Sequence, residues 1–155
     1  MILEQRHRDT FTSAFDYFFE DNDASNLCLM LLEVAHIWDD MVDKDKDISP
    51  DNINTVFKYL VYDIPINPIY RRIPSLPDHM LSVYLQWRDA TNIENDGPSD
   101  DDLNKCYVLR AGIYDIFSVI AYYLRGDTIA KEIGPAIRRL YGETLDVYKE
   151  EFKNA

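Results

Sequence analysis

The chain has few cysteines, few basic residues and no long apolar run, and each shortage excludes a class of protein. Its two cysteines, Cys28 and Cys106, are far apart and lack a histidine at ligand spacing, so we expect neither a disulfide framework nor a zinc site. Sixteen basic residues face 28 acidic ones, and the net charge of −12 disfavours binding to nucleic acid or to anionic membrane surfaces. No apolar run approaches the length of a membrane span, so membrane insertion is not expected.

The composition is that of a folded protein. Apolar residues make up 46% of the 155 residues, with eleven tyrosines and seven phenylalanines, which excludes the polar, aromatic-poor kind of disordered chain. This length suits one domain, covering residues 1–155. The first residues, MILEQRHRDTF, contain no apolar segment typical of a secretory signal. We therefore expect a soluble, cytoplasmic protein.

The hydrophobic pattern predicts an all-α, single-domain bundle of about six helices, because no segment alternates at period two for long enough to form a strand. The predicted helices are Leu3–Glu20, Asp23 or Ser25 through Val42, Pro50–Tyr62, Pro77–Ile93, Asp100–Gly126, and Asp127 or Thr128 to Phe152. We expect Gly134, Pro135 and Gly142 to kink or divide the last of these.

Capping and breaking residues set the expected helix ends. Ser49 followed by Pro50, and Ser99 farther along, are typical of helix starts, because serine caps free backbone amides and proline fits the first turn. Gly126 is expected to end a helix. Residues 63–77 contain four prolines and are predicted to form an irregular connection.

Residues 33–49, EVAHIWDDMVDKDKDIS, carry five aspartates within nine positions. At 100° per residue, five polar side chains share one side of the predicted helix: Glu33, His36, Asp39, Asp40 and Asp43. Leu29 and Leu32 lie on that side one or two turns earlier, so the acidic face is a candidate for a surface turned into the protein. Carboxylates held close together repel each other, and the repulsion is relieved by a bound cation, by a raised carboxyl pKa or by basic partners from other helices. Oxygen ligands without cysteine favour Mg²⁺, Mn²⁺ or Ca²⁺, and no organic cofactor is indicated.

The letters DDMVD at residues 39–43 resemble the DDxxD motif of the trans-isoprenyl diphosphate synthases and related class I terpene synthases. The surrounding HIWDDMVDKDKDIS is similar to the helix end on which that family carries the motif. The resemblance implies a shortened isoprenoid-synthase-like bundle that binds Mg²⁺ and, through it, a diphosphate-bearing small molecule. It implies Asp39 and Asp43 as metal ligands and Asp40 as a less direct one. The second acidic motif of the family is not matched, and the nearest acidic group is Asp146, Glu150 and Glu151.

Two other interpretations of the aspartate run differ from this one. Counted from Asp43, DKDKDISPDNIN places oxygens as in a calcium-binding EF-hand loop, but Ile48 stands where the turn needs glycine and Asn54 where a bidentate glutamate is needed. The simpler interpretation is a solvated helix end that keeps the protein in solution.

Four further residues are candidates for a site. His36 lies one turn before the aspartates, as a supporting partner or an ordinary hydrogen-bonding residue. Asp115 lies in GIYDIFSVIAYYL, which is apolar on every side, so we expect it to be paired or neutralised. Together with Arg110 and Tyr114 it is a candidate for the wall opposite the aspartates, while a structural contact in the core is the alternative.

Two functions follow, and the sequence does not decide whether either involves catalysis. One is a divalent-metal site for a diphosphate-bearing small molecule. The other is a non-enzymatic helical protein that oligomerises, with copies of itself or with a protein partner, and whose aspartates are solubilising.

Overall fold

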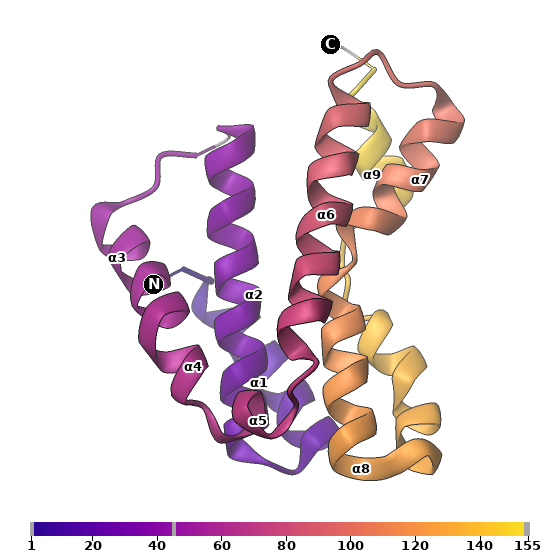
Figure 1. The fold of residues 1–155 in the computed structure, drawn as a ribbon. Helices are drawn as coiled ribbons and strands as arrows, with labels where there is room; N and C mark the ends of the chain where they lie inside the picture. The colour runs from indigo at the N-terminus through magenta and orange to yellow at the C-terminus, as the bar shows by residue number, and fades with distance from the viewer. Residues whose placement is uncertain (1, 45, 154–155) are drawn as a thin grey trace.

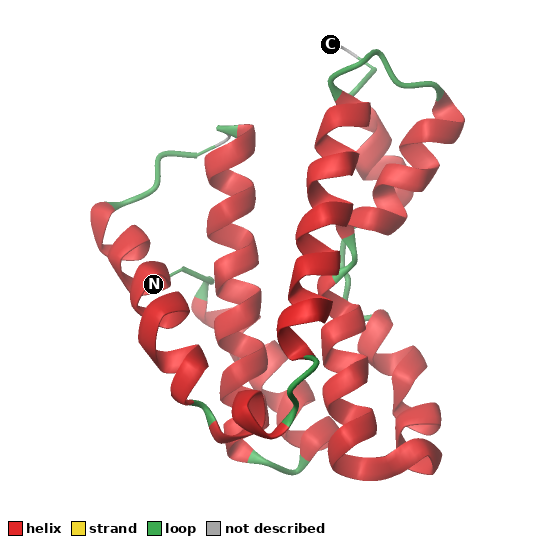
Figure 2. Ribbon diagram, in the orientation of Figure 1, coloured by secondary structure: helices red, strands yellow, loops and turns green. Residues whose placement is uncertain are grey.

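Helices account for the fold in the computed structural model, which describes residues 2–44 and 46–153 (Figures 1 and 2). The elements are α1 (Gln5–Phe19), α2 (Asn22–Asp43), α3 (Pro50–Lys58), the π-helical turn η1 (Tyr59–Asp63), α4 (Ile64–Ile66), α5 (Pro68–Arg72), α6 (Leu76–Glu94), α7 (Asp100–Arg110), α8 (Ile113–Arg138) and α9 (Leu145–Glu150). The described residues form no strand, and the predicted all-α bundle is confirmed.

Side-chain caps fix the starts of several helices. Ser49 caps α3 by accepting a hydrogen bond from the Asn52 amide, and Ser99 caps α7 in a capping box, as the sequence predicts. The second helix begins earlier than predicted. Asp21 has an extended backbone, and its carboxylate accepts from the Ala24 amide at 2.9 Å, so α2 starts at Asn22.

The prediction that residues 63–77 are irregular is wrong. This segment holds the end of η1, all of α4 and α5, and the start of α6. Pro68 and Pro77 fall in the first two positions of α5 and α6, where the missing amide hydrogen would have no partner. Pro65 lies in α4, which continues directly from η1. Asn67 caps α5 by accepting from the amides of Ile69 and Tyr70. Pro68 and Pro77 therefore mark helix starts here.

The predicted helix over Asp100–Gly126 is divided into α7 and α8 by a turn at Ala111 and Gly112. The indole Nε1 of Trp87, on α6, donates to the backbone carbonyl of Arg110 at 3.0 Å and so satisfies a group that the break exposes. Gly126 interrupts α8 with a non-helical backbone (φ 78°), which a residue with a side chain rarely adopts.

The predicted last helix is divided, as expected for the segment around Gly142. Its first part ends with α8 at Arg138 and contains Pro135, and Gly142 lies in the connection to the separate short helix α9, which ends at Glu150 rather than at Phe152.

The apolar interior consists of two clusters. The larger joins α1, α2, α6 and α8 around Phe15, Phe19 and Phe117, with the rings of Phe15 and Phe117 4.9 Å apart. The smaller joins α6, α7 and α9 around Cys106 and Tyr148. In Figure 1, α2 and α6 diverge toward their C-terminal ends, and α7 and α9 pack on the far side of α6.

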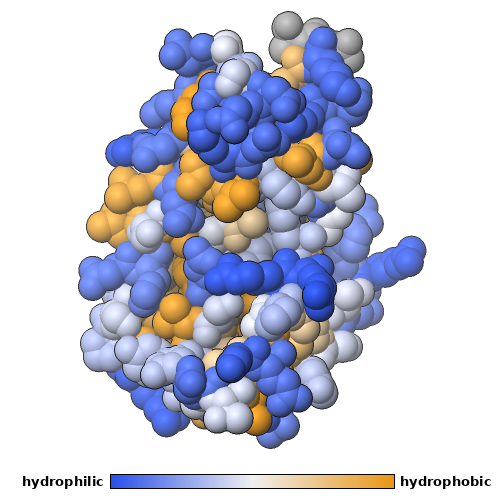
Figure 3. All heavy atoms as spheres, turned by 90° about the vertical axis from the view of Figure 1, so that its right-hand side faces the viewer, coloured by the Kyte–Doolittle hydropathy of each residue, from blue (hydrophilic) through white to orange (hydrophobic). Residues whose placement is uncertain are grey.

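The molecular surface on the α7–α9 side is mostly hydrophilic, with apolar side chains in separate patches (Figure 3). Among the described residues, no helix combines the length and the apolarity needed to cross a membrane.

Candidate functional site

A cavity of about 770 Å³ lies between the C-terminal half of α2, the start of α1, the end of α6 and the segment around α9. Its polar lining includes His7, His36, Asp39, Asp43, Glu94 and Arg110. Its apolar and aromatic lining includes Phe11, Leu32, Trp87, Ile113, Tyr114 and Phe152. The volume lies in the range that holds a small-molecule ligand, and polar groups gathered among apolar ones are typical of such sites.

Asp39 and Asp43 lie one turn apart on the last turns of α2, and both line the cavity. Burial and the neighbouring carboxylate of Asp43, which hydrogen-bonds to it, raise the pKa of Asp39 to about 7. At neutral pH the Asp39 carboxyl is therefore protonated in a large fraction of the molecules, which relieves its repulsion with the neighbouring carboxylate. The sequence predicts that these two side chains share a face of the helix, and in the structure that face lines the cavity.

Arg110 faces these aspartates at the end of α7. Its Nη1 lies 3.3 Å from Asp39 Oδ1, its Nε donates to Glu94 at 3.1 Å, and its guanidinium carbon lies 4.7 Å from the centre of the Trp87 ring. The Arg110 side chain is 10% exposed. Five contacts from α2 and α6 hold the guanidinium in one position at the wall of the cavity.

Glu94, at the end of α6, was missed by the sequence analysis. Its side chain is 6% exposed and accepts hydrogen bonds from Arg110 and from the hydroxyl of Tyr148 on α9. Glu94 therefore ties three helices together beside the cavity. In the sequence it is one acid among many before a turn, and its partners are 16 and 54 positions away, so no local pattern identifies it.

His36 lines the cavity one turn before Asp39, close to its predicted place. Burial lowers the pKa of His36, and the nearby Asp40 opposes that shift. The imidazole is therefore neutral at pH 7, when it can donate one hydrogen bond and accept another.

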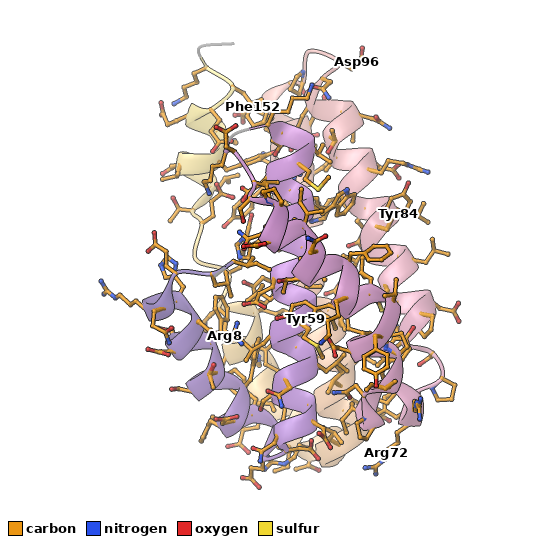
Figure 4. All side chains as sticks on the ribbon, turned by 90° about the vertical axis from the view of Figure 1, so that its left-hand side faces the viewer. Arg8, Tyr59, Arg72, Tyr84, Asp96 and Phe152 are labelled. Carbon is orange, nitrogen blue, oxygen red and sulfur yellow. The ribbon has the colours of Figure 1, made fainter. Side chains whose placement is uncertain are left out.

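Asp40 and Glu33 lie outside the cavity lining, although the sequence groups them with Asp39. Asp40 pairs loosely with Lys46, with 3.5 Å between Oδ1 and Nζ. Glu33 is 2% exposed and accepts hydrogen bonds from Arg8 and from the Tyr59 hydroxyl, the latter at 2.9 Å. Arg8 and Tyr59 reach α2 from α1 and η1 (Figure 4). Glu33 thus links three elements of the fold.

Tyr114 and Asp115 are neighbours in the sequence and lie in different surroundings. Tyr114 is 5% exposed and lines the cavity, and burial raises the pKa of its phenol. Asp115 lies outside the cavity lining. Its side chain is 47% exposed and accepts a hydrogen bond from Arg138 at 2.5 Å. The expected pairing of Asp115 is present, but on the surface of α8 and away from the aspartates.

The metal-ligating groups of the site are few. Across residues 2–44 and 46–153, no three histidine, cysteine, aspartate or glutamate side chains lie close enough together to form a metal-binding group. Asp45, within the aspartate run, lies outside the described residues. Among the carboxylates that line the cavity, Asp39 and Asp43 are one turn apart on α2 and form the pair available to a single cation. Mg²⁺ is commonly held in this way, by one or two carboxylates together with water and the phosphates of a substrate.

Comparisons with known proteins give no relative for this chain. No protein-family model, no curated protein and no solved structure matches it. The likeness of DDMVD to the DDxxD motif therefore has no second source of support, and the geometry of the cavity is the basis for a functional proposal.

Proposed function

We propose that the cavity binds a diphosphate-bearing small molecule with an apolar body, through a divalent cation held by Asp39 and Asp43. The observation that carries the proposal is the pair of neighbouring carboxylates at the wall of a cavity that is otherwise largely apolar. Protonation of Asp39 is one way to relieve their repulsion, and Mg²⁺ is another.

The charge balance of the cavity favours a cation as the link to a phosphate. Asp39, Asp43 and Glu94 line it, and the one arginine among the lining residues is already paired with Asp39 and Glu94. A diphosphate alone meets repulsion in these surroundings, whereas its complex with Mg²⁺ brings positive charge to the carboxylates. Arg110 then lies beside the metal and is a second partner for a phosphate oxygen.

The remaining lining favours an apolar body on the ligand. Phe11, Leu32, Ile113 and Phe152 line the cavity together with Tyr114. Covering an apolar group here removes its surface from water, which contributes about 25 cal/mol for each Å². An isoprenoid diphosphate combines these properties, and the proposal covers its binding without assigning a reaction.

Thermal unfolding tests the proposal. The melting temperature is measured with a chelator, with Mg²⁺, and with Mg²⁺ plus pyrophosphate or an isoprenoid diphosphate. The test variant carries Asp39→Asn and Asp43→Asn. The matched control carries Asp127→Asn and Glu132→Gln, which remove the same charge from exposed positions on α8.

We expect Mg²⁺ to raise the melting temperature of the wild type and of the control, and a diphosphate to raise it further, because ligands of the native state stabilise it. The Asp39/Asp43 variant is expected to lose both responses. An equal response in the two variants would show that Mg²⁺ acts on general surface charge, and no response in the wild type would reject the site.

A further inference from the structure

A continuous apolar face lies outside the cavity, on α3, η1 and the neighbouring parts of α2 and α6. A ridge on this face consists of Ile53, Phe57 and Val61, which are spaced four residues apart and are 43%, 64% and 56% exposed. Side chains four apart on a helix form a raised row. Of the apolar stripe of α3, Val56 is buried, while Ile53 and Phe57 remain in solvent. In an amphipathic helix such a stripe normally packs against the rest of the protein.

A groove of about 370 Å³ runs beside the ridge, between α2, α3 with η1, and α6. Its lining includes Trp38 and Met41 of α2, Leu60 of η1, and Met80 and Tyr84 of α6. The ring of Trp38 stacks on that of Tyr84 with 5.6 Å between centres. Figure 4 views this side of the molecule, with Tyr59 on η1 near the centre and Tyr84 on α6 to its right. Val56 and Leu60 line the groove and directly precede Phe57 and Val61 of the ridge, so the ridge borders the groove along α3 and η1.

We propose that this face is the interface of a homodimer, in which the ridge of each copy lies in the groove of the other across a two-fold axis. Such a dimer needs a self-complementary patch, and a ridge beside a groove of similar chemistry provides one. This proposal does not depend on ligand binding in the cavity, because polar groups of the cavity such as Asp39 and Arg110 do not line the groove, although Ala35, Trp87 and Ile113 line both.

The exposed area suits a second copy. Met41, Leu60 and Tyr84 are 52%, 44% and 47% exposed, and with the ridge they leave roughly 700 Å² of mainly apolar side-chain surface. A standard stable interface buries about 800 Å² on each partner. The face is thus close to the size that a specific dimer requires, whereas one small ligand would leave most of it in water.

The charges beside the face allow two copies to approach. Lys58 pairs with Asp63 at 2.9 Å, and Arg88 pairs with Asp89 at 2.8 Å, so these charges are balanced within each chain. The whole chain nevertheless carries a charge of −12, which makes two copies repel at long range. The dimer is therefore expected to strengthen with added salt. A basic helix from another protein would instead bind more weakly as salt increases.

Sedimentation velocity over a range of protein concentrations, at low and at high salt, tests the proposal with the full chain. The test variants are Phe57→Glu and Val61→Glu, and the control is Val108→Glu, at an apolar position on α7 that is 69% exposed. All three sites are open to solvent, so the substitutions are expected to leave the melting temperature nearly unchanged.

We expect a concentration-dependent dimer in the wild type and in Val108→Glu, stronger at high salt. Each ridge variant is expected to weaken the dimer at least about tenfold, because a carboxylate would be buried between the copies. A monomer at every concentration, a dimer that the ridge variants leave intact, or a dimer weakened by salt would each overturn the proposal.

Discussion

Trp87 contacts Arg110 through both its edge and its face: its indole Nε1 donates to the Arg110 carbonyl at 3.0 Å, and the Arg110 guanidinium lies 4.7 Å from the centre of the ring. The hydrogen bond satisfies a backbone carbonyl at the break between α7 and α8. The ring contact holds the Arg110 guanidinium beside the cavity. One side chain of α6 thus sets both the turn of the chain and the position of the cation that faces Asp39.

We expect Trp87→Phe to lower the free energy of unfolding by about 1–3 kcal/mol, because the Arg110 carbonyl loses its donor while most of the apolar contact remains. Urea denaturation measures the change. Tyr84→Phe, at an exposed aromatic position on the same helix, is the matched control and is expected to change stability by less than about 0.5 kcal/mol. Equal effects of the two substitutions would show that the indole hydrogen bond contributes little.

The raised pKa of Asp39 predicts how stability depends on pH when a chelator removes metal. The pKa of Asp39 is about 7 in the folded protein and near its ordinary value, about 4, in the unfolded chain. The folded state therefore holds the proton more tightly. This contribution is fully present below pH 4 and is lost as the pH rises through 7.

Asp39→Asn removes the ionisation, so the variant is expected to be more stable than the wild type at pH 8 and to lose that advantage at pH 4. Because 38% of the Asp39 side chain is exposed, solvent screens the repulsion and we expect a gain of about 1–2 kcal/mol at pH 8. Denaturation curves at the two pH values measure it. Parallel pH profiles for the two proteins would contradict the raised pKa of Asp39.

Glu94 is expected to be more important for stability than either aspartate of the cavity. Glu94→Gln keeps the shape of the side chain but leaves Arg110, which is 10% exposed, with one carboxylate partner in place of two. Removing one member of a buried ion pair commonly costs about 3–5 kcal/mol, and the remaining Asp39 reduces this to about 2–3 kcal/mol. A double-mutant cycle with Tyr148→Phe separates the hydroxyl contact, and full additivity would show that the three groups do not act together.

Removing Arg8 alone is expected to cost more stability than removing Arg8 and Glu33 together. Arg8→Met takes away the cation that pairs with Glu33, which is 2% exposed and keeps its hydrogen bond from the Tyr59 hydroxyl. We expect the free energy of unfolding to fall by about 2–4 kcal/mol. Adding Glu33→Met to that variant is expected to restore part of the loss, since an apolar side chain is cheaper to bury than an unpaired charge. Chemical denaturation measures both, and a double variant less stable than Arg8→Met would be the contrary result.

Local signals in the sequence were sufficient for some features of this protein and insufficient for others. Ser49 and Ser99 act within four residues of themselves, so their caps follow from the sequence alone. The prolines of residues 63–77 are compatible both with a loop and with a series of helix starts, and packing of Ile64 and Ile69 into the core decides between them.

The site was predictable to the extent that it depends on one helix. Asp39 and Asp43 share a face because they are four residues apart. Arg110 was a candidate because it lies near other polar side chains, such as Tyr114, along one predicted helix, but its pairing with Glu94 depends on how α6 and α7 meet. Asp115 was expected in an apolar environment, but its side chain is half-exposed. Its partner Arg138 lies beyond the interruption of α8 at Gly126, so the pairing depends on a long-range turn of the chain.

The division of the apolar interior into two clusters affects how the protein opens. The cavity has walls from both, with Leu32 and Ile113 on the side of the larger cluster and Tyr148 and Phe152 on the side of the smaller one. The smaller cluster contains few buried residues, so the amide hydrogens of α7 and α9 are expected to exchange through a local opening that leaves α2 and α8 folded. A molecule that contacts both walls at once joins the two clusters into one cooperative unit, and slower exchange in α7 and α9 would then report its presence.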